Sequence, residues 1–95
     1  MLYSVELGKN IVELRNLEGI SQEQLALRSN VSVSYLRDIE HGRVNPTIDI
    51  LESIAKTLKV DLMTLFLYSL EIDEIQTTLE QSKENAARAK QNALV

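Results

Sequence analysis

The spacing of the apolar residues constrains the fold of this chain more than any other feature. These residues recur three and four positions apart along almost the whole sequence, while alternating apolar and polar residues are scarce. Spacings of three and four place side chains on one face of an α-helix, whereas a half-buried strand has a period of two. Two such stripes are Leu7, Ile11 and Leu14, and Leu51, Ile54, Ala55 and Leu58. The sequence therefore predicts an all-α protein.

Residues that start and stop helices divide residues 1–70 into five short helices. In chain order, Gly19 is a stop, Ser21 a cap, Gly42 a stop, and Thr47 and Asp61 are caps. Ser21 and Gln24 have the spacing of a capping box, in which each side chain bonds the backbone amide of the other residue. The second helix is predicted over roughly residues 22–29 and the third over about residues 32–41. The fifth is expected to begin after Asp61.

The break between the second and third helices contains no glycine. It falls within the stretch SQEQLALRSNVSVSYLRDIEHG, residues 21–42, at Asn30. Asparagine adopts the left-handed backbone conformation more readily than most other non-glycine residues, so we expect Asn30 to turn the chain and Val31 to enter the core. At about 100° per residue, the outward face of the third helix then carries Ser34, Arg37, Asp38 and His41. This face is predicted to be polar and exposed.

The composition is that of one small globular domain. The 95 residues suit a single core, and 44% hydrophobic with 25% charged residues is an ordinary balance. The absence of cysteine excludes disulfides and thiolate metal sites and is typical of a reducing compartment. The longest apolar run, VDLMTLFLYSL, is far shorter than the roughly 20 residues that span a bilayer, and the N-terminus lacks the pattern of a secretory signal. We expect a cytoplasmic protein with no membrane partner.

The net charge of −4 argues against a nucleic-acid partner, because proteins that bind phosphate are usually basic. Half of the excess negative charge, however, lies in residues 71–95. The sign of the face that touches phosphate matters more than the total, and an acidic domain can still present a basic stripe. Charge alone therefore does not exclude DNA binding.

Several motifs occur together between Lys9 and Phe66. They are Ser21 and Gln22 opening the second helix, Ala26, the turn at Asn30, the stretch YLRDIEHG with Glu40 and Gly42, and the continuation NPTIDILESIAKTL. In this combination the chain resembles the Cro and phage-repressor, or Xre-type, helix-turn-helix family. The resemblance implies a five-helix lambda-repressor-like DNA-binding domain in residues 1–70, with an additional C-terminal helix in residues 71–95. It also implies that the third helix lies in the major groove of DNA.

Carried over from that family, the predicted DNA-binding residues are Gln22, Ser32, Val33, Ser34, Tyr35, Arg37, Asp38, Arg43 and Asn45. Gln22 is expected to bond a phosphate from the start of the second helix. Arg37 is the strongest candidate for reading a base, because a guanidinium can bond guanine O6 and N7 together. Val33 is suited to a thymine methyl group, and Ser34 to a base edge or a phosphate.

The remaining members of the set carry open alternatives. Tyr35, Arg43 and Asn45 are expected on the flanking phosphates, although Tyr35 could equally be rim packing. Asp38 would repel phosphate unless it accepts from cytosine N4 or orients Arg37. Arg37 and Asp38 could also be ordinary solvated residues. The bases that are read therefore stay open.

A second stripe of apolar residues continues past the family domain. Leu65, Tyr68, Ile72, Ile75 and Leu79 follow spacings of three and four, and the same register then passes through serine and alanine residues. This is the pattern of a coiled-coil seam, and we predict that it holds a homodimer. The alternative is that the stripe folds back on its own domain. A twofold dimer would also read two DNA half-sites.

The function predicted from these features is that of a dimeric repressor acting at an inverted-repeat operator, of the phage, mobile-element or restriction-modification controller type. An antitoxin-type protein-interaction module with autoregulatory DNA binding is the alternative. No glycine-rich phosphate loop, metal-ligand cluster or pair of nucleophile and base is visible, so we expect no enzyme activity, cofactor or small-molecule ligand. Glu40 is expected to have a structural role.

Overall fold

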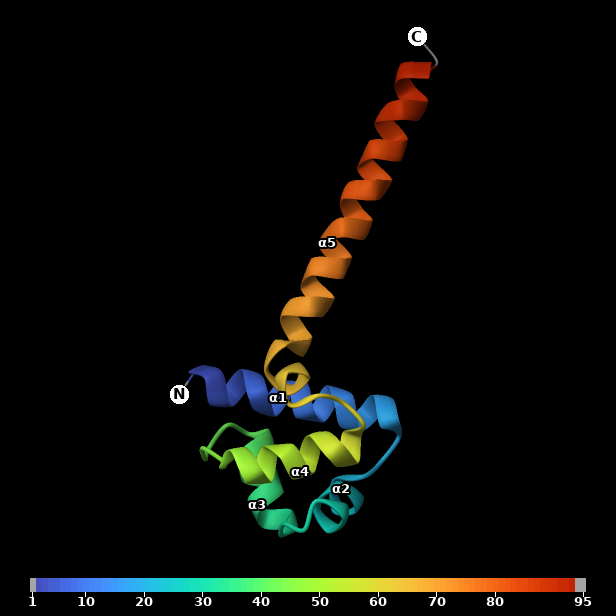
Figure 1. Ribbon diagram of the computed structural model, residues 1–95. Helices are drawn as coiled ribbons and strands as arrows, with labels where there is room; N and C mark the ends of the chain where they lie inside the picture. The colour runs from blue at the N-terminus through green and yellow to red at the C-terminus, as the bar shows by residue number, and fades with distance from the viewer. Residues whose placement is uncertain (1, 94–95) are drawn as a thin grey trace.

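Five α-helices form the protein (Figure 1). The computed structural model describes the backbone of residues 2–93 and the side chains of residues 3–70 and 74–88. The helices are α1 (Leu2–Glu18), α2 (Gln22–Arg28), α3 (Val33–Glu40), α4 (Ile48–Leu58) and α5 (Leu62–Ala93). No strand occurs in the described backbone. The all-α, five-helix prediction is confirmed.

The short-range signals at Ser21, Thr47 and Asn30 act as the sequence predicted. Ser21 Oγ accepts from Gln24 N at 3.0 Å, and Gln24 Oε1 accepts from Ser21 N at 2.8 Å, which is the predicted capping box. Thr47 Oγ1 caps α4 by accepting from Ile50 N at 3.3 Å. Asn30 has a φ of 58°, so it makes the left-handed turn between α2 and α3. These local interactions determine where α2 and α4 begin and where the chain turns between α2 and α3.

One aliphatic core joins the helices. Its buried members are Leu7, Ile11, Leu14, Leu25, Ala26, Leu36, Ile39, Leu51, Ile54, Ala55, Leu58 and Leu65. Every helix contributes to it, and the two stripes predicted for α1 and α4 lie in it. Val31 is half-buried against this core at the corner between α2 and α3, as expected. The helix-turn-helix unit, which consists of α2 and α3, thus packs against α1 and α4 through this core.

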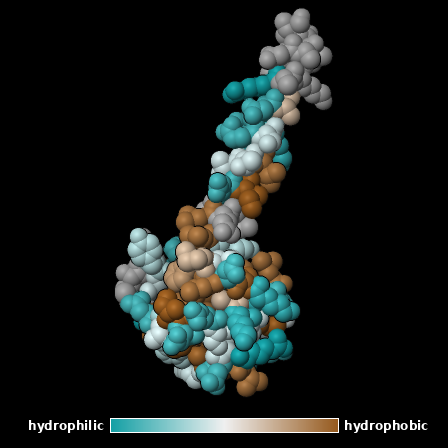
Figure 2. Space-filling view, in the orientation of Figure 1, coloured by the Kyte–Doolittle hydropathy of each residue, from teal (hydrophilic) through white to brown (hydrophobic). Residues whose placement is uncertain are grey.

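The predicted additional C-terminal helix is not a separate element. α5 begins at Leu62 and continues without interruption to Ala93, so the fifth helix and the extension are one helix of 32 residues. Its first turns pack against α1 and α4, and the remainder projects away from the other helices (Figure 1). Figure 2 shows hydrophobic side chains at the base of this projection and along part of it. Among the described residues, no helix is long and apolar enough to cross a membrane.

A buried side chain fixes the base of α5 to α1. Asn10 is fully buried, and its Nδ2 donates to the backbone oxygen of Leu65 at 2.7 Å. Leu65 is itself fully buried in the core. The first turns of α5 are therefore part of the domain, and they position everything that follows them.

Candidate nucleic-acid interface

The N-terminal half of α3 is held by a cap and presents polar side chains. Ser32 Oγ accepts from Tyr35 N at 3.0 Å, and this bond starts the helix. Ser34 and Arg37 are exposed on the outward face, as predicted. Within the described residues Arg37 has no side-chain hydrogen bond or ion pair, so its guanidinium is available to an external acceptor. That is the state required of a residue that reads a base edge.

Two of the predicted contact residues also serve the core. Val33 and Tyr35 are half-buried and pack against the buried cluster. For Tyr35 this supports the packing alternative, although part of its side chain stays at the surface. Both side chains border the outward face of α3 because they lie on its first turn. They shape the edge of the surface that Ser34 and Arg37 present.

The loop after α3 adds one basic and one amide side chain. Arg43 Nη1 lies 3.7 Å from Asp38 Oδ1, and both side chains are substantially exposed. Asp38 is therefore paired with Arg43, and among the described residues it forms no ion pair with Arg37. Asn45 is exposed and accepts a hydrogen bond from Ser4 Oγ at 2.5 Å, which connects this loop to the start of α1. Arg43 is thus held beside α3 by a pair that solvent screens strongly.

A buried carboxylate anchors the other end of α3. The Glu40 side chain is 4% exposed; its Oε2 accepts from Arg15 Nε at 3.0 Å and its Oε1 from Arg15 Nη2 at 3.2 Å. Gln22 Nε2 also donates to Glu40 Oε1 at 3.0 Å. Glu40 therefore connects α3 to α1 and to the first residue of α2. It has the structural role expected of it.

Two glycines allow α1 and the end of α3 to approach closely. A Cβ atom on Gly8 would stand 2.4 Å from the Glu40 backbone oxygen and 2.6 Å from that of Ile39. Gly42 has a φ of +70°, and a Cβ there would stand 2.8 Å from Val5 Cα. Only glycine fits at these contacts, because the neighbouring atoms belong to backbone. The separation of α1 and α3 therefore depends on both residues.

Arg15 and Gly8 were missing from the sequence prediction of this region. Both lie on the buried side of α1, at positions that follow the stripe of Leu7, Ile11 and Leu14. A charged residue of each sign on buried faces, Arg15 and Glu40, was a signal for a buried pair. A glycine inside an amphipathic helix was likewise a signal for close packing.

His41 does not extend the site. Its Nδ1 lies 2.7 Å from the backbone oxygen of Arg37, at the C-terminus of α3. Within the described residues, no group of three or more histidine, aspartate or glutamate side chains could hold a metal ion. The surface built from α3, Arg43 and Asn45 therefore offers hydrogen bonds and positive charge.

Comparison with known proteins identifies this arrangement. The helix-turn-helix family matches residues 11–65, which is more than half of the chain and includes α2, α3 and α4. The chain belongs to this family. Its members of the Xre type are DNA-binding transcriptional regulators and not enzymes. The resemblance noted in the sequence is confirmed.

A curated relative illustrates how much of a regulator the chain represents. The immunity repressor of Bacillus phage phi105 is 37% identical over 59 residues, which are 62% of this chain and 41% of the repressor. The chain therefore spans less than half the length of that relative. What the two share is the helix-turn-helix region.

Two solved structures resemble this helix-turn-helix protein over larger shares of its length. The restriction-modification controller C.AhdI of Aeromonas hydrophila is 32% identical with a TM-score of 0.68, and covers 70% of this chain and 100% of its own. The clp gene regulator ClgR of Corynebacterium glutamicum is 25% identical with a TM-score of 0.70, and covers 94% of this chain and 90% of its own. The second match extends into the projecting part of α5.

The predicted dimerisation seam divides into two parts in the structure. Leu65 is buried in the core and Tyr68 is half-buried against it, so these two fold back on their own domain. Ile75 and Leu79 are 54% and 56% exposed beyond the domain. Ile72 lies outside the described side chains. Of the five seam residues, only Ile75 and Leu79 are thus seen to be available to a partner.

Proposed function

We propose that this protein binds an inverted-repeat operator as a homodimer and represses transcription by occluding the promoter. One observation carries the proposal: Arg37 is exposed on the outward face of α3, within the region that matches the family, and has no side-chain partner among the described residues. An arginine in this state can form the bidentate contact with guanine that gives sequence discrimination in the major groove. Such a regulator works in the cytoplasm, on the chromosome or on phage DNA.

The surrounding residues support different parts of this function. Ser34 and Val33 lie beside Arg37 and can add contacts to base edges and to a thymine methyl group. Arg43, Asn45, Tyr35 and the N-terminus of α2 at Gln22 can contact the phosphates on either side, which set position and general affinity. The Asp38 carboxylate keeps the Arg43 side chain beside the major groove of the DNA. Its negative charge also disfavours a phosphate in the wrong position.

Dimerisation follows from the size of the reading surface. One α3 spans only a few base pairs, whereas two copies related by a twofold axis read two half-sites and gain affinity by avidity. α5 is the natural place for the contact, because its exposed apolar residues are not covered within the domain. The predicted seam of Ile75 and Leu79 is one candidate surface on this helix.

A phage repressor and a restriction-modification controller among the similar proteins support the repressor type. The proposal is tested by selecting bound fragments from a random pool of duplex DNA, followed by footprinting on the enriched sequence. We expect an inverted repeat with half-sites about 10–10.5 base pairs apart, or a multiple of that distance. Enrichment of a single unpaired motif would refute the dimer, and no enrichment would refute specific DNA binding.

A further inference from the structure

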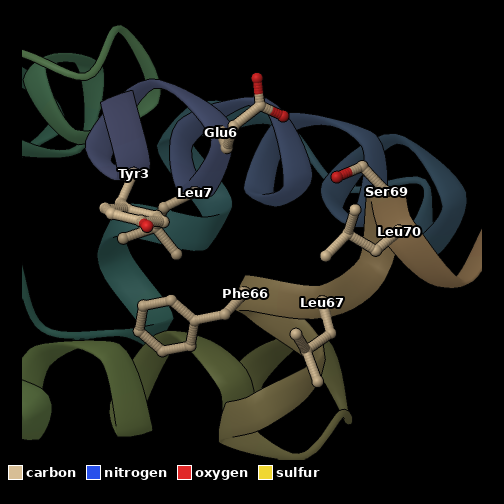
Figure 3. A pocket seen from close by; sticks show the side chains of 7 residues that line it. All are labelled: Tyr3, Glu6, Leu7, Phe66, Leu67, Ser69 and Leu70. Atoms are coloured by element: carbon tan, nitrogen blue, oxygen red, sulfur yellow. The ribbon is translucent and has the colours of Figure 1, made fainter. Parts of the chain in front are cut away.

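An apolar groove lies between the start of α1 and the base of α5 (Figure 3). Its volume is about 340 Å³, and its lining residues are Tyr3, Glu6, Leu7, Phe66, Leu67, Ser69 and Leu70. Figure 3 shows Tyr3 and Leu7 of α1 and Leu70 of α5 turned toward the space between the helices, while the carboxylate of Glu6 points away. A second hollow of about 250 Å³ shares Tyr3, Leu7 and Phe66 and extends the groove to Pro46 and Ile48.

The residues around this groove leave an unusual amount of apolar surface in contact with solvent. Tyr3 is 86% exposed, Leu70 63% and Ile48 55%. Contiguous aromatic and aliphatic side chains of this kind mark protein interaction sites on soluble domains. The lining residues of the larger hollow all lie outside residues 11–65, so the shared helix-turn-helix region does not account for the groove.

We propose that the groove is the twofold contact between two copies of this chain, with Tyr3 of each copy entering the groove of the other. The proposal rests on the proposed function, because it supplies the dimer that an inverted repeat requires. In a twofold interface the same patch must complement itself, so that residue i contacts residue j and j contacts i. This patch meets that condition: Tyr3 protrudes from the α1 wall, and Leu67 and Leu70 form the α5 wall opposite it.

The charge at the groove also suits a second copy. A twofold contact brings identical charges together, so a charged patch repels its own copy. The carboxylate among the lining residues, Glu6, is paired with Lys9 Nζ at 3.8 Å, which offsets its charge. A small ligand fits less well, because such sites need several convergent polar groups and this lining is almost wholly apolar.

The position of the groove keeps α3 free for DNA. α1 packs against α3 on one side and against α5 on the other (Figure 1). A partner seated between α1 and α5 therefore does not cover the outward face of α3. Both walls are held in place before binding, because Asn10 bonds the Leu65 backbone at 2.7 Å beneath them.

The groove and the exposed seam residues lie on different faces of α5. At about 100° per residue, Leu79 lies about 180° around the helix from Leu70 and about 120° from Leu67, and Ile75 lies about 140° and about 80° from these two residues. Because the two surfaces face different directions around α5, a single twofold contact through the groove does not bury both. A dimer formed through the groove therefore leaves Ile75 and Leu79 on its outer side, in contrast to the seam predicted from sequence.

Paired aspartate substitutions on the two faces test this geometry. Tyr3→Asp with Leu70→Asp puts two charges in the groove, and Ile75→Asp with Leu79→Asp puts two on the seam as a matched control. All four side chains are more than half exposed, so circular dichroism should show unchanged helix content. In sedimentation at micromolar concentration we expect the wild type and the seam variant to be dimers and the groove variant to be a monomer. A dimeric groove variant, a monomeric seam variant or a monomeric wild type overturns the inference.

Cross-linking provides a second readout that does not depend on disrupting the fold. The chain has no cysteine, so a copy with Tyr3→Cys can be mixed with a copy carrying Leu70→Cys under mild oxidation. We expect mass spectrometry to find the disulfide between the two different copies. Cross-linking only in a Leu79→Cys control would place the contact on the seam and overturn the inference.

DNA binding separates failure of the inference from failure of the proposed function. We expect the groove variant to lose about a hundredfold or more in affinity for the full operator, because avidity is lost, while it retains binding to a half-site. If the groove variant stays dimeric and still protects an inverted repeat, the inference fails and the proposed function stands. If the wild type protects no inverted repeat, the proposed function fails, whatever its oligomeric state.

Discussion

The two ends of α3 differ sharply in how they are held. At the N-terminal half, Ser32 supplies a cap, and Ser34 and Arg37 extend into solvent without a side-chain partner among the described residues. At the C-terminal end, Glu40 is buried and bonded to Arg15 and Gln22, as well as lying against Gly8. The helix is therefore fixed from its C-terminal end and inner face. The outward residues can then change without loosening the helix.

The largest expected effect follows from the buried pair. Glu40→Ala leaves the Arg15 guanidinium, 15% exposed, without its carboxylate, and breaking a buried pair in this way costs about 3–5 kcal/mol of unfolding free energy. Asp38→Ala breaks the exposed pair with Arg43 and should cost less than about 1 kcal/mol. Chemical denaturation of the three proteins measures both changes. Similar losses for the two variants would show that the two ends of α3 are held alike.

The close approach at Gly8 gives the next effect. Gly8→Ala introduces a Cβ within 2.4 Å of the Glu40 backbone oxygen, so α1 or α3 must move, which costs about 1–3 kcal/mol. The sign of the change in unfolding free energy is informative. At an exposed position inside a helix, replacing glycine by alanine stabilises the helix by about 1 kcal/mol. Asn16→Ala, at an exposed position of α1, is the control and should stay within about 0.5 kcal/mol of wild type. A stabilised Gly8→Ala protein in thermal unfolding would contradict the contact.

The difference between local bonds and contacts between distant helices also explains which features could be predicted from the sequence. The caps at Ser21 and Thr47 and the turn at Asn30 depend on neighbours within four residues, so the sequence alone predicted them. The Arg15 and Glu40 pair and the Gly8 contact join helices that are far apart in the chain. Their individual signals were present, but only the packing of α1 on α3 shows which partner each residue has.

The extension shows a different source of error. Residues 62–93 contain no glycine or proline, so nothing in them stops a helix, yet the end of the family resemblance suggested a boundary near residue 70. The groove was missed for a related reason. Its walls come from residues 3–7 and 66–70, which meet only when α1 packs on α5, and the stripe chosen from sequence was the opposite face of α5.

Substitutions on the outward face of α3 test the other side of the comparison. Arg37→Ala should leave stability unchanged within about 0.5 kcal/mol, because the side chain is exposed and pairs with none of the side chains that the structure describes. It should cost roughly 1–3 kcal/mol in binding to the selected operator and relax the choice at one base pair. Titration against the operator and a scrambled duplex measures both. Equal losses on the two duplexes would remove Arg37 from the base-reading role.

Arg43 gives the smallest and least selective effect. Its guanidinium lies beside Asp38 at 3.7 Å in the loop after α3, and from this position we expect it to contact a phosphate rather than a base edge. Arg43→Ala should therefore weaken operator and scrambled duplex alike, and reduce the slope of log affinity against log salt by about one unit, because one fewer counterion is released. Titrations at several salt concentrations separate this from the Arg37 effect. A loss confined to the operator, with the slope unchanged, would mean that Arg43 reads a base and that the reading surface extends beyond α3 into the loop.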